Sequence, residues 1–277
     1  MEIVLGFIIA VAIGITGVGA GVVTAPVLIL FFHVSPAHAV GTALAFSVAV
    51  KILVVPMQIY RKQVDYRVLA YMLAGGLPGV LAGSYILAKL NTKGASGILY
   101  SALGATVVIM AAANLYRLWL KPTRKVERDW SRWLPAIALP IGAEVGFSSA
   151  GAGAIGSLAL LWLTPLSAAR VVGTDLFFGL CLSLVGSGFQ LSAGNYDLAI
   201  LTQLVIGGVF GAFAGTYVAA ITPQRAFRIV LSVWLITLGI QLCWSGVSQL
   251  QPNAAPKAAA VSTRVAGAPT SVPIAAK

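Results

Sequence analysis

Eight long apolar segments constrain this chain more than any other feature of its sequence. They run approximately over residues 3–32, 38–60, 68–88, 96–120, 134–163, 166–192, 198–221 and 225–248. A helix needs about 20 apolar residues to cross a bilayer, and continuous rather than alternating hydrophobicity favours helices over a β-barrel. Only 9% of the residues are charged, whereas soluble domains carry about 25%. The sequence therefore predicts an all-α polytopic membrane protein.

The first and fifth segments contain the same glycine-rich break. GITGVGAG, which begins at Gly14, aligns without a gap with GFSSAGAG, which begins at Gly146, at a shift of 132 residues. The same shift superposes the Gly-Thr pairs at 41–42 and 173–174, and GGLPGVLAG at 75–83 on GGVFGAFAG at 207–215. One shift across three motifs indicates an internal duplication.

The duplication divides the chain into two homologous four-segment membrane repeats, residues 1–120 and 134–248, joined by a basic linker over 121–133. Residues 249–277 are rich in Ala, Pro, Ser and Thr and lack aromatic residues. Such a segment buries too little apolar surface to offset its ordering entropy, so a disordered C-terminal tail is expected.

The breaks contain four and three glycines in eight residues, and glycine costs a helix about 1 kcal/mol relative to alanine. Pro26 follows the first break, so we expect an unwound turn there. Each segment could then be a broken helix that crosses the membrane or a re-entrant hairpin of two half-helices. Both arrangements place 12 Lys and Arg residues on one side and 5 on the other, with Lys51 left in the membrane.

The turns that follow the second segment of each repeat favour the hairpins. The turn RKQVDYR in the first repeat is basic, whereas its counterpart SAGNYDL carries no positive charge. Equivalent turns on opposite faces of a membrane would differ in this way. An odd number of crossings per repeat makes the repeats inverted, which is a common plan among transporters.

The breaks predict an anion site. A half-helix that starts at a break directs unpaired N–H groups and the positive end of its dipole into the membrane. These half-helices are expected to begin near Val22–Thr24 and near Ala154–Ser157. The predicted substrate-binding residues at the breaks are Thr16, Gly19, Gly21, Ser148, Ser149, Gly151 and Gly153, with Thr42 and Thr174 in support. The alternative is that the glycines allow close packing and that the hydroxyls bond locally.

Three charged residues lie well inside apolar segments. Lys51 is near the middle of the second segment, where a charge costs about 2.5–3.5 kcal/mol on insertion scales, so it should face the protein interior and supply positive potential to the substrate site. Glu144, at the second break, and Asp175, after the second Gly-Thr pair, are the acids in such positions. Either acid could pair with Lys51 or carry a coupling proton. A structural ion pair is the alternative.

Other classes of function find no support in the sequence. The net charge of +11 arises mostly in short loops, where it orients a membrane protein rather than binding nucleic acid. There is no nucleophile–base set, no His/Cys/Asp cluster and no phosphate loop followed by Lys-Ser/Thr. We therefore expect neither an enzyme, a metal nor a cofactor. The small residues four apart in GGLPGVLAG and GGVFGAFAG indicate close helix packing.

Several motifs together resemble the TauE/SafE sulfite exporter family over residues 1 to about 248. They are GITGVGAGVVTAPVLI, SPAHAVGTALA, YRKQVDYR and GGLPGVLAGSYIL in the first repeat, and GFSSAGAGAIGSLAL, AARVVGTDLFFGL and GGVFGAFAGTYVA in the second. The resemblance implies a secondary, ATP-independent transporter, and specifically an exporter, of sulfite, thiosulfate or an organosulfonate in the bacterial cytoplasmic (inner) membrane.

The expected partners are a small anionic substrate, coupling protons and the lipid bilayer. Nucleic acid is not among them. A passive anion channel on the same scaffold is the alternative function. The sequence leaves the oligomeric state open, a homodimer included.

Overall fold

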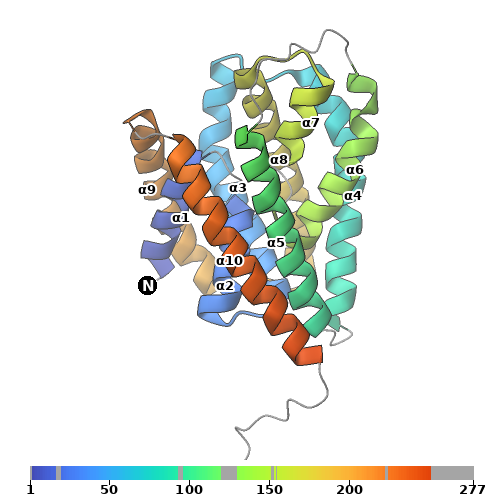
Figure 1. The fold of residues 1–277 in the computed structure, drawn as a ribbon, viewed down its shortest axis with the longest axis vertical. Coiled ribbons are helices and arrows are strands. Elements are labelled where there is room, and N and C mark those ends of the chain that lie inside the picture. The colour runs from blue at the N-terminus through green and yellow to red at the C-terminus, as the bar shows by residue number, and fades with distance from the viewer. Residues whose placement is uncertain are drawn as a thin grey trace, which may run out of the picture.

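The computed structural model describes residues 2–16, 20–92, 96–119, 130–150, 153, 155–221 and 224–250. Over these ranges the chain is helical and contains no strand (Figure 1). The helices are α1 Glu2–Thr16, α2 Ala20–Phe32, α3 Pro36–Tyr60, α4 Tyr66–Thr92, α5 Ser96–Trp119, α6 Leu134–Ser148, α7 Ile155–Leu163, α8 Ala168–Ser192, α9 Leu198–Ile221 and α10 Gln224–Leu250. A short 3₁₀ turn, Ser131–Trp133, leads into α6. The expected disordered tail lies outside the described residues beyond position 250.

Among the described residues, six helices are long and apolar enough to cross a membrane: α3, α4, α5, α8, α9 and α10. They coincide with six of the eight predicted segments. The other two segments, the first and the fifth, are each divided into two short helices of 9 to 15 residues. At 1.5 Å per residue, none of these short helices spans the roughly 30 Å hydrocarbon core alone.

The second pair of short helices, α6 and α7, forms a hairpin that returns to the end of the bundle where it began. The Trp130 N–H, just before α6, donates to the Leu163 carbonyl at the end of α7 over 2.9 Å. Figure 1 shows α6 and α7 side by side at that end. Ser149 ends α6 in the left-handed conformation with φ 64°, and its N–H closes the last turn on the Val145 carbonyl. The fifth segment is thus re-entrant rather than a broken crossing helix.

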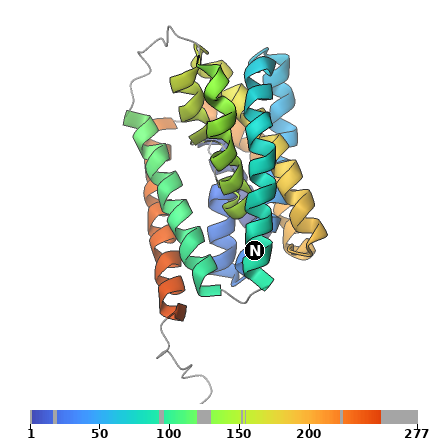
Figure 2. The same ribbon diagram turned by 90° about the vertical axis from the view of Figure 1, so that its right-hand side faces the viewer.

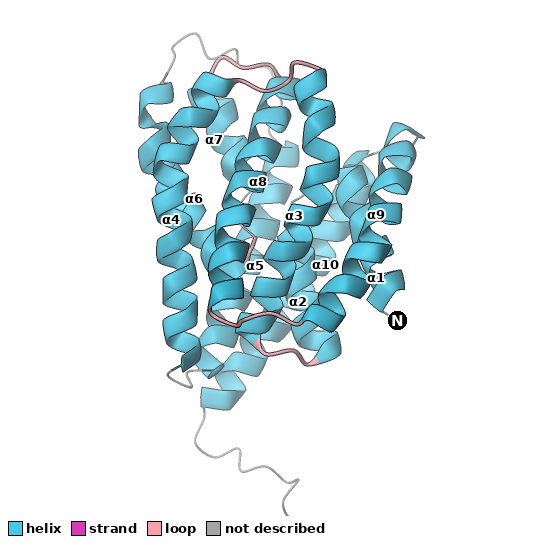
Figure 3. Cartoon of the chain, turned by 180° about the vertical axis from the view of Figure 1, so that it is seen from behind, coloured by secondary structure: helices cyan, strands magenta, loops and turns pink. Residues whose placement is uncertain are grey.

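The first pair, α1 and α2, enters from the opposite end of the bundle. Figures 1 and 3 place the N-terminus, the end of α2 and the end of α10 toward that same end. Here the predicted start of the second half-helix is corrected: α2 begins at Ala20 rather than near Val22. Pro26 lies inside α2 and does not end it. Residues 17–19, between α1 and α2, lie outside the described residues.

Rows of glycines bring the hairpins against long helices. A Cβ on Gly79 of α4 would overlap the Leu139 carbonyl of α6, and a Cβ on Gly211 of α9 would overlap the Phe7 carbonyl of α1. Along each pair of helices, the residue numbers of the contacting positions rise together: 75 with 135, 79 with 139 and 83 with 143, and likewise 207 with 3 and 211 with 7. Helix α4 therefore runs parallel to α6, and α9 runs parallel to α1. The packing role predicted for these glycine motifs is confirmed.

The central helices α3 and α8 run antiparallel. A Cβ on Gly41, near the start of α3, would overlap the Asn195 carbonyl in the turn after α8. A Cβ on Gly173, near the start of α8, would overlap the Gln63 carbonyl in the turn after α3. Each helix therefore begins against the turn that follows the other, and the two contacts differ by the shift of 132 found in the sequence.

The core lies around these central helices, while the outside of the bundle is apolar. Phe178 and Phe46 are fully buried, and their rings fill the notches left by Gly76 and Gly208. Helices α5 and α10 run side by side along one side of the bundle (Figure 2). On the outer surface, large apolar side chains such as Phe210 are more than half exposed, as expected of a surface that faces lipid rather than water.

Candidate functional site

The breaks of the two hairpins meet inside the bundle. The Ser149 hydroxyl donates to the Gly21 carbonyl over 3.1 Å, and a Cβ on Gly21 would overlap the backbone carbonyl of Ser149. Ser149 is buried, and its left-handed backbone turns the chain out of α6 at this point. Two of the predicted binding residues, which are 128 positions apart in the sequence, are therefore in direct contact.

The other predicted residues at the breaks are only partly described. Thr16 is the last residue of α1, but its side chain lies outside the described residues, as do Gly19 and Gly151 in full. Gly153 has φ 109°, a conformation that favours glycine, and it precedes α7. The helix α7 begins at Ile155, inside the range predicted for it.

The last turn of α6 holds one of the two predicted proton carriers. The Ser148 hydroxyl donates to Glu144 Oε1 over 2.6 Å and accepts the N–H of Ala150 over 3.2 Å. Glu144 Oε2 is buried without a hydrogen-bond partner in the part of the chain that the structure describes. Because burial of a charged oxygen without a donor is costly, this carboxyl group is suited to accept a proton.

The second acid, Asp175 of α8, contacts the first turn of α7. Ser157 Oγ donates to Asp175 Oδ2, and a Cβ on Gly156 would overlap Oδ1. Asp175 is only 4% exposed. A carboxylate at a helix N-terminus is stabilised by the helix dipole. A side chain of the protein itself thus lies where the sequence predicts a substrate anion. Ser157 was not foreseen, because a lone serine in an apolar helix gives no sequence signal.

Lys51 lies buried where α3 crosses α8. Its ammonium group donates to the Gly179 carbonyl and to the Ser183 hydroxyl, each over 3.1 Å. Asp175, one turn before Gly179, attracts the ammonium electrostatically. The Ser47 and Ser183 hydroxyls are hydrogen-bonded over 3.3 Å. The prediction that Lys51 faces the interior is confirmed. Its two acceptors on α8 were missed, although position 183 is related to position 51 by the shift of 132.

The two threonines predicted to support the site hold turns at the ends of the bundle. Thr42 Oγ1 accepts the N–H of Asp197, and Thr174 Oγ1 accepts the N–H of Asp65, each over 3.0 Å. Both threonines are fully buried. The two hydrogen bonds are counterparts under the shift of 132. Each hydroxyl therefore fixes the turn that precedes a long helix of the other half.

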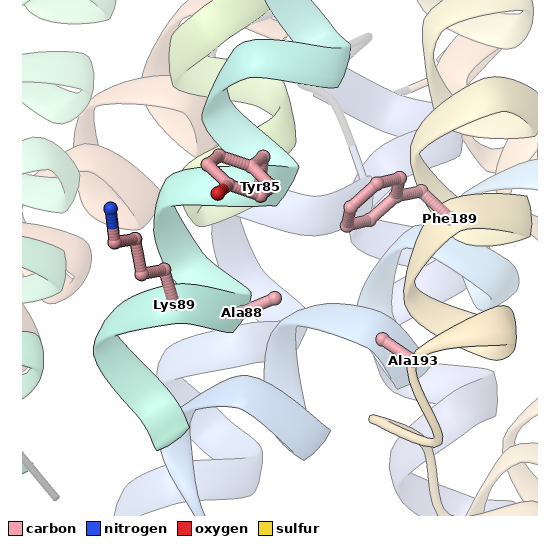
Figure 4. A pocket seen from close by; sticks show the side chains of 5 residues that line it. All are labelled: Tyr85, Ala88, Lys89, Phe189 and Ala193. Atoms are coloured by element: carbon pink, nitrogen blue, oxygen red, sulfur yellow. The ribbon is translucent and has the colours of Figure 1, made fainter. Parts of the chain in front are cut away.

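A groove on the outside of the bundle lies apart from these residues. It has a volume of about 340 Å³ and is lined by Tyr85, Ala88, Lys89, Phe189 and Ala193. Figure 4 shows the two rings on opposite sides of the gap between α4 and α8. Its described lining contains none of the predicted site residues. No group of three His, Cys, Asp or Glu residues suited to a metal occurs among the described residues.

Comparison with known proteins agrees with this architecture. The family model described as "Sulfite exporter TauE/SafE" matches residues 2–242. Three proteins of Bacillus subtilis (strain 168) are similar to the chain, and each carries the description "probable membrane transporter protein". YjnA is 24% identical over 251 residues, which cover 87% of this chain and 98% of that protein. YunE is 25% identical over 271 residues, which cover 88% and 97%.

The third relative, YdhB, is 26% identical over 244 residues, which cover 87% of this chain and 98% of that protein. No solved structure matches the chain. Because the family model covers nearly all the helices described above, the chain belongs to the sulfite exporter TauE/SafE family and is a multi-pass membrane transporter.

Proposed function

We propose that this protein is a secondary transporter that exports a small sulfur-containing anion, such as sulfite, thiosulfate or an organosulfonate, from the bacterial cytoplasm. The observation that carries the proposal is the contact between the two hairpin breaks, Ser149 with Gly21, inside the bundle. Irregular backbone at membrane depth is tolerated only where protein or a water-filled cavity surrounds it. The name of the family supports the sulfur-containing anion as substrate.

The two halves, residues 1–120 and 134–248, would act as inverted repeats. Several pairs of contacts support a pseudo-twofold relation between them, because each pair differs by the shift of 132: Gly41 with Asn195 and Gly173 with Gln63, and likewise the two threonine hydrogen bonds. The antiparallel course of α3 and α8 supports an axis that would lie in the plane of the membrane. Alternating access would then follow from one half rocking against the other around a fixed site.

The substrate anion would bind where the hairpins meet. Backbone N–H groups of Gly19, Gly21, Gly151 and Gly153, and hydroxyl groups of Thr16, Ser148 and Ser149, would donate to its oxygens. Lys51 would supply positive potential through the buried α3–α8 crossing. Thr42 and Thr174 would support the site by fixing the turns around it.

Protons would couple to transport through Glu144 and Asp175. While Asp175 is charged, it opposes the positive potential of Lys51 and of the first turn of α7. A proton on Asp175 would remove this opposition and favour an incoming anion. Glu144, with Oε2 buried and unpaired among the described residues, could take up a proton at the break of the same hairpin.

The distribution of charge supports an orientation. The turn after α3 and the starts of α6 and α8 carry Arg61, Lys62, Arg132 and Arg170 at one end of the bundle. The positive-inside rule places that end in the cytoplasm. The start of α1 and the end of α10 would then both lie on the other side of the bacterial inner membrane.

Flux measured in proteoliposomes tests the function. Vesicles loaded with sulfite, thiosulfate or taurine should release the substrate and should exchange it with unlabelled substrate on the other side. Lys51→Met should reduce flux by at least about tenfold, the effect of about 1.4 kcal/mol in the barrier, while the protein remains folded. A passive anion channel is the alternative function. It would conduct without a proton gradient and would show no counterflow. Absence of flux for every sulfur anion would refute the proposal.

A further inference from the structure

The crossing of α3 and α8 contains a cluster of four small or polar residues, Ser47, Lys51, Gly179 and Ser183. Lys51 donates to the Gly179 carbonyl and to the Ser183 hydroxyl, and Ser47 is hydrogen-bonded to Ser183. Lys51 is 7% exposed and Ser183 is 1% exposed. The cluster is therefore sealed from the surface and joins the two halves of the chain.

The four residues of this cluster are two pairs of equivalent positions in the two repeats. Under the shift of 132, position 47 corresponds to position 179, and position 51 corresponds to position 183. The contact of Lys51 with Gly179 is therefore the counterpart of the contact of Ser47 with Ser183. The contact of Lys51 with Ser183 joins a position to its own equivalent. In a twofold arrangement, a position touches its own equivalent only at the axis.

We propose that the ammonium group of Lys51 lies on the pseudo-twofold axis, and that position 183 can carry this charge in place of position 51. The inference rests on the proposed function for its effect on transport. It assigns one positive centre to the whole chain, at the crossing of α3 and α8 where the two halves meet.

The geometry explains how the exchange would work. A lysine introduced at position 183 would start from the other side of the axis and extend to the same point. By symmetry it would donate to the carbonyl of residue 47 and to a hydroxyl introduced at position 51. The cluster is asymmetric in one respect, because position 47 is serine and position 179 is glycine. An exact exchange therefore also requires Ser47→Gly and Gly179→Ser.

The test compares Lys51→Ser, Ser183→Lys, the two combined, and the fourfold exchange with Ser47→Gly and Gly179→Ser. Melting temperature and the yield of monodisperse protein give a readout independent of transport. Ser183→Lys alone puts two ammonium groups against each other, so it should give the lowest melting temperature or no folded protein. Adding Lys51→Ser should recover most of the loss, a non-additive effect typical of residues in contact.

Flux in proteoliposomes completes the test. Lys51→Ser should lose at least about tenfold in flux, and the combined or fourfold variant should regain most of it. The proposal is overturned if, in both exchanged variants, the melting temperature falls by as much as the sum of the falls caused by the single changes. It is also overturned if the melting temperature recovers but the flux does not. If Lys51→Ser transports normally while the stability effects are non-additive, the shared position stands. The proposed role of Lys51 in transport is then wrong.

Discussion

Ser149 donates a hydrogen bond to the carbonyl of Gly21 over 3.1 Å and so joins the break of one hairpin to that of the other. Two conformational features make this contact possible. Ser149 adopts φ 64°, a region that non-glycine residues seldom occupy, and Gly21 has no Cβ to overlap the Ser149 carbonyl. The two breaks are therefore held together by backbone shape as much as by the hydroxyl.

Changes at this contact should reduce transport. Gly21→Ala should lower both the melting temperature and the flux, because its Cβ would push the hairpins apart. Ser149→Gly keeps the left-handed backbone and lets the hairpins stay in contact. It removes the hydrogen bond to Gly21, worth about 1 kcal/mol, and the hydroxyl proposed to contact the substrate, so its effect on flux should be smaller than that of Gly21→Ala. Flux per folded protein checks this order. Wild-type flux in both variants would show that the contact has no part in transport.

The glycine rows should be intolerant of even a methyl group. Gly79→Ala and Gly211→Ala would each place a Cβ against the backbone of a hairpin helix, so each should lower the melting temperature markedly. Gly188→Ala is the matched control, since a Cβ there meets nothing within 4 Å. This control should be neutral or stabilising by up to about 1 kcal/mol, as alanine favours a helix. Equal behaviour of all three variants would contradict the packing role.

Thr42→Val and Thr174→Val should act on stability rather than on transport. Each change leaves one backbone N–H, that of Asp197 or Asp65, without its acceptor. An unsatisfied donor costs about 1–3 kcal/mol when it is buried. These two N–H groups are partly buried, so each loss should fall toward the lower end of that range, and the two should be similar because the contacts are counterparts. Thermal unfolding and flux per folded protein measure the two effects separately. A selective loss of flux would instead indicate that these hydroxyls contact the substrate.

Glu144→Gln should abolish the dependence of transport on a proton gradient. The amide oxygen can still accept the hydrogen bond of Ser148, so the fold should be preserved while the proton site is lost. Asp65 caps the start of α4, where its Oδ1 accepts the N–H of Val68. Asp65→Asn removes this carboxylate at the end of the bundle and serves as the control, because asparagine also caps a helix. Flux with and without an imposed gradient checks the result. Unchanged gradient dependence would exclude Glu144 as the proton carrier.

The orientation can be measured by labelling single cysteines. In a background without Cys181 and Cys243, Lys62→Cys should react with a membrane-impermeant maleimide only from the cytoplasmic side. Ser192→Cys, at the end of α8, should react only from the opposite side. Both positions are exposed and lie in or next to turns. The reverse pattern would contradict the orientation inferred from the positive charges.

The long helices and the breaks could be predicted because both are local properties of the sequence. Runs of apolar residues define α3 and α8, and clustered glycines define where the hairpins turn. Pairing in space was harder to foresee. Equal charge counts did not separate hairpin from crossing, the unequal charge of the turns RKQVDYR and SAGNYDL favoured hairpins, and the contact of Trp130 with Leu163 shows the second hairpin directly.

The partners of the charged residues could not be predicted, because they come from distant segments. Nothing near Lys51 in the sequence indicates Ser183, and nothing near Asp175 indicates the first turn of α7. The shift of 132 contained part of this information. Applied to Lys51, it points to Ser183, the residue that the structure places against it.

The exchange of packing partners between the halves has a consequence for biosynthesis. The glycine face of α4 in the first half packs on α6 in the second, and that of α9 in the second half packs on α1 in the first. Neither half therefore buries its own glycine face. A nascent chain that has inserted only as far as α5 would hold these faces against lipid until the ribosome delivers the remainder. Separately synthesised halves would therefore have to find each other in the bilayer before either could mature.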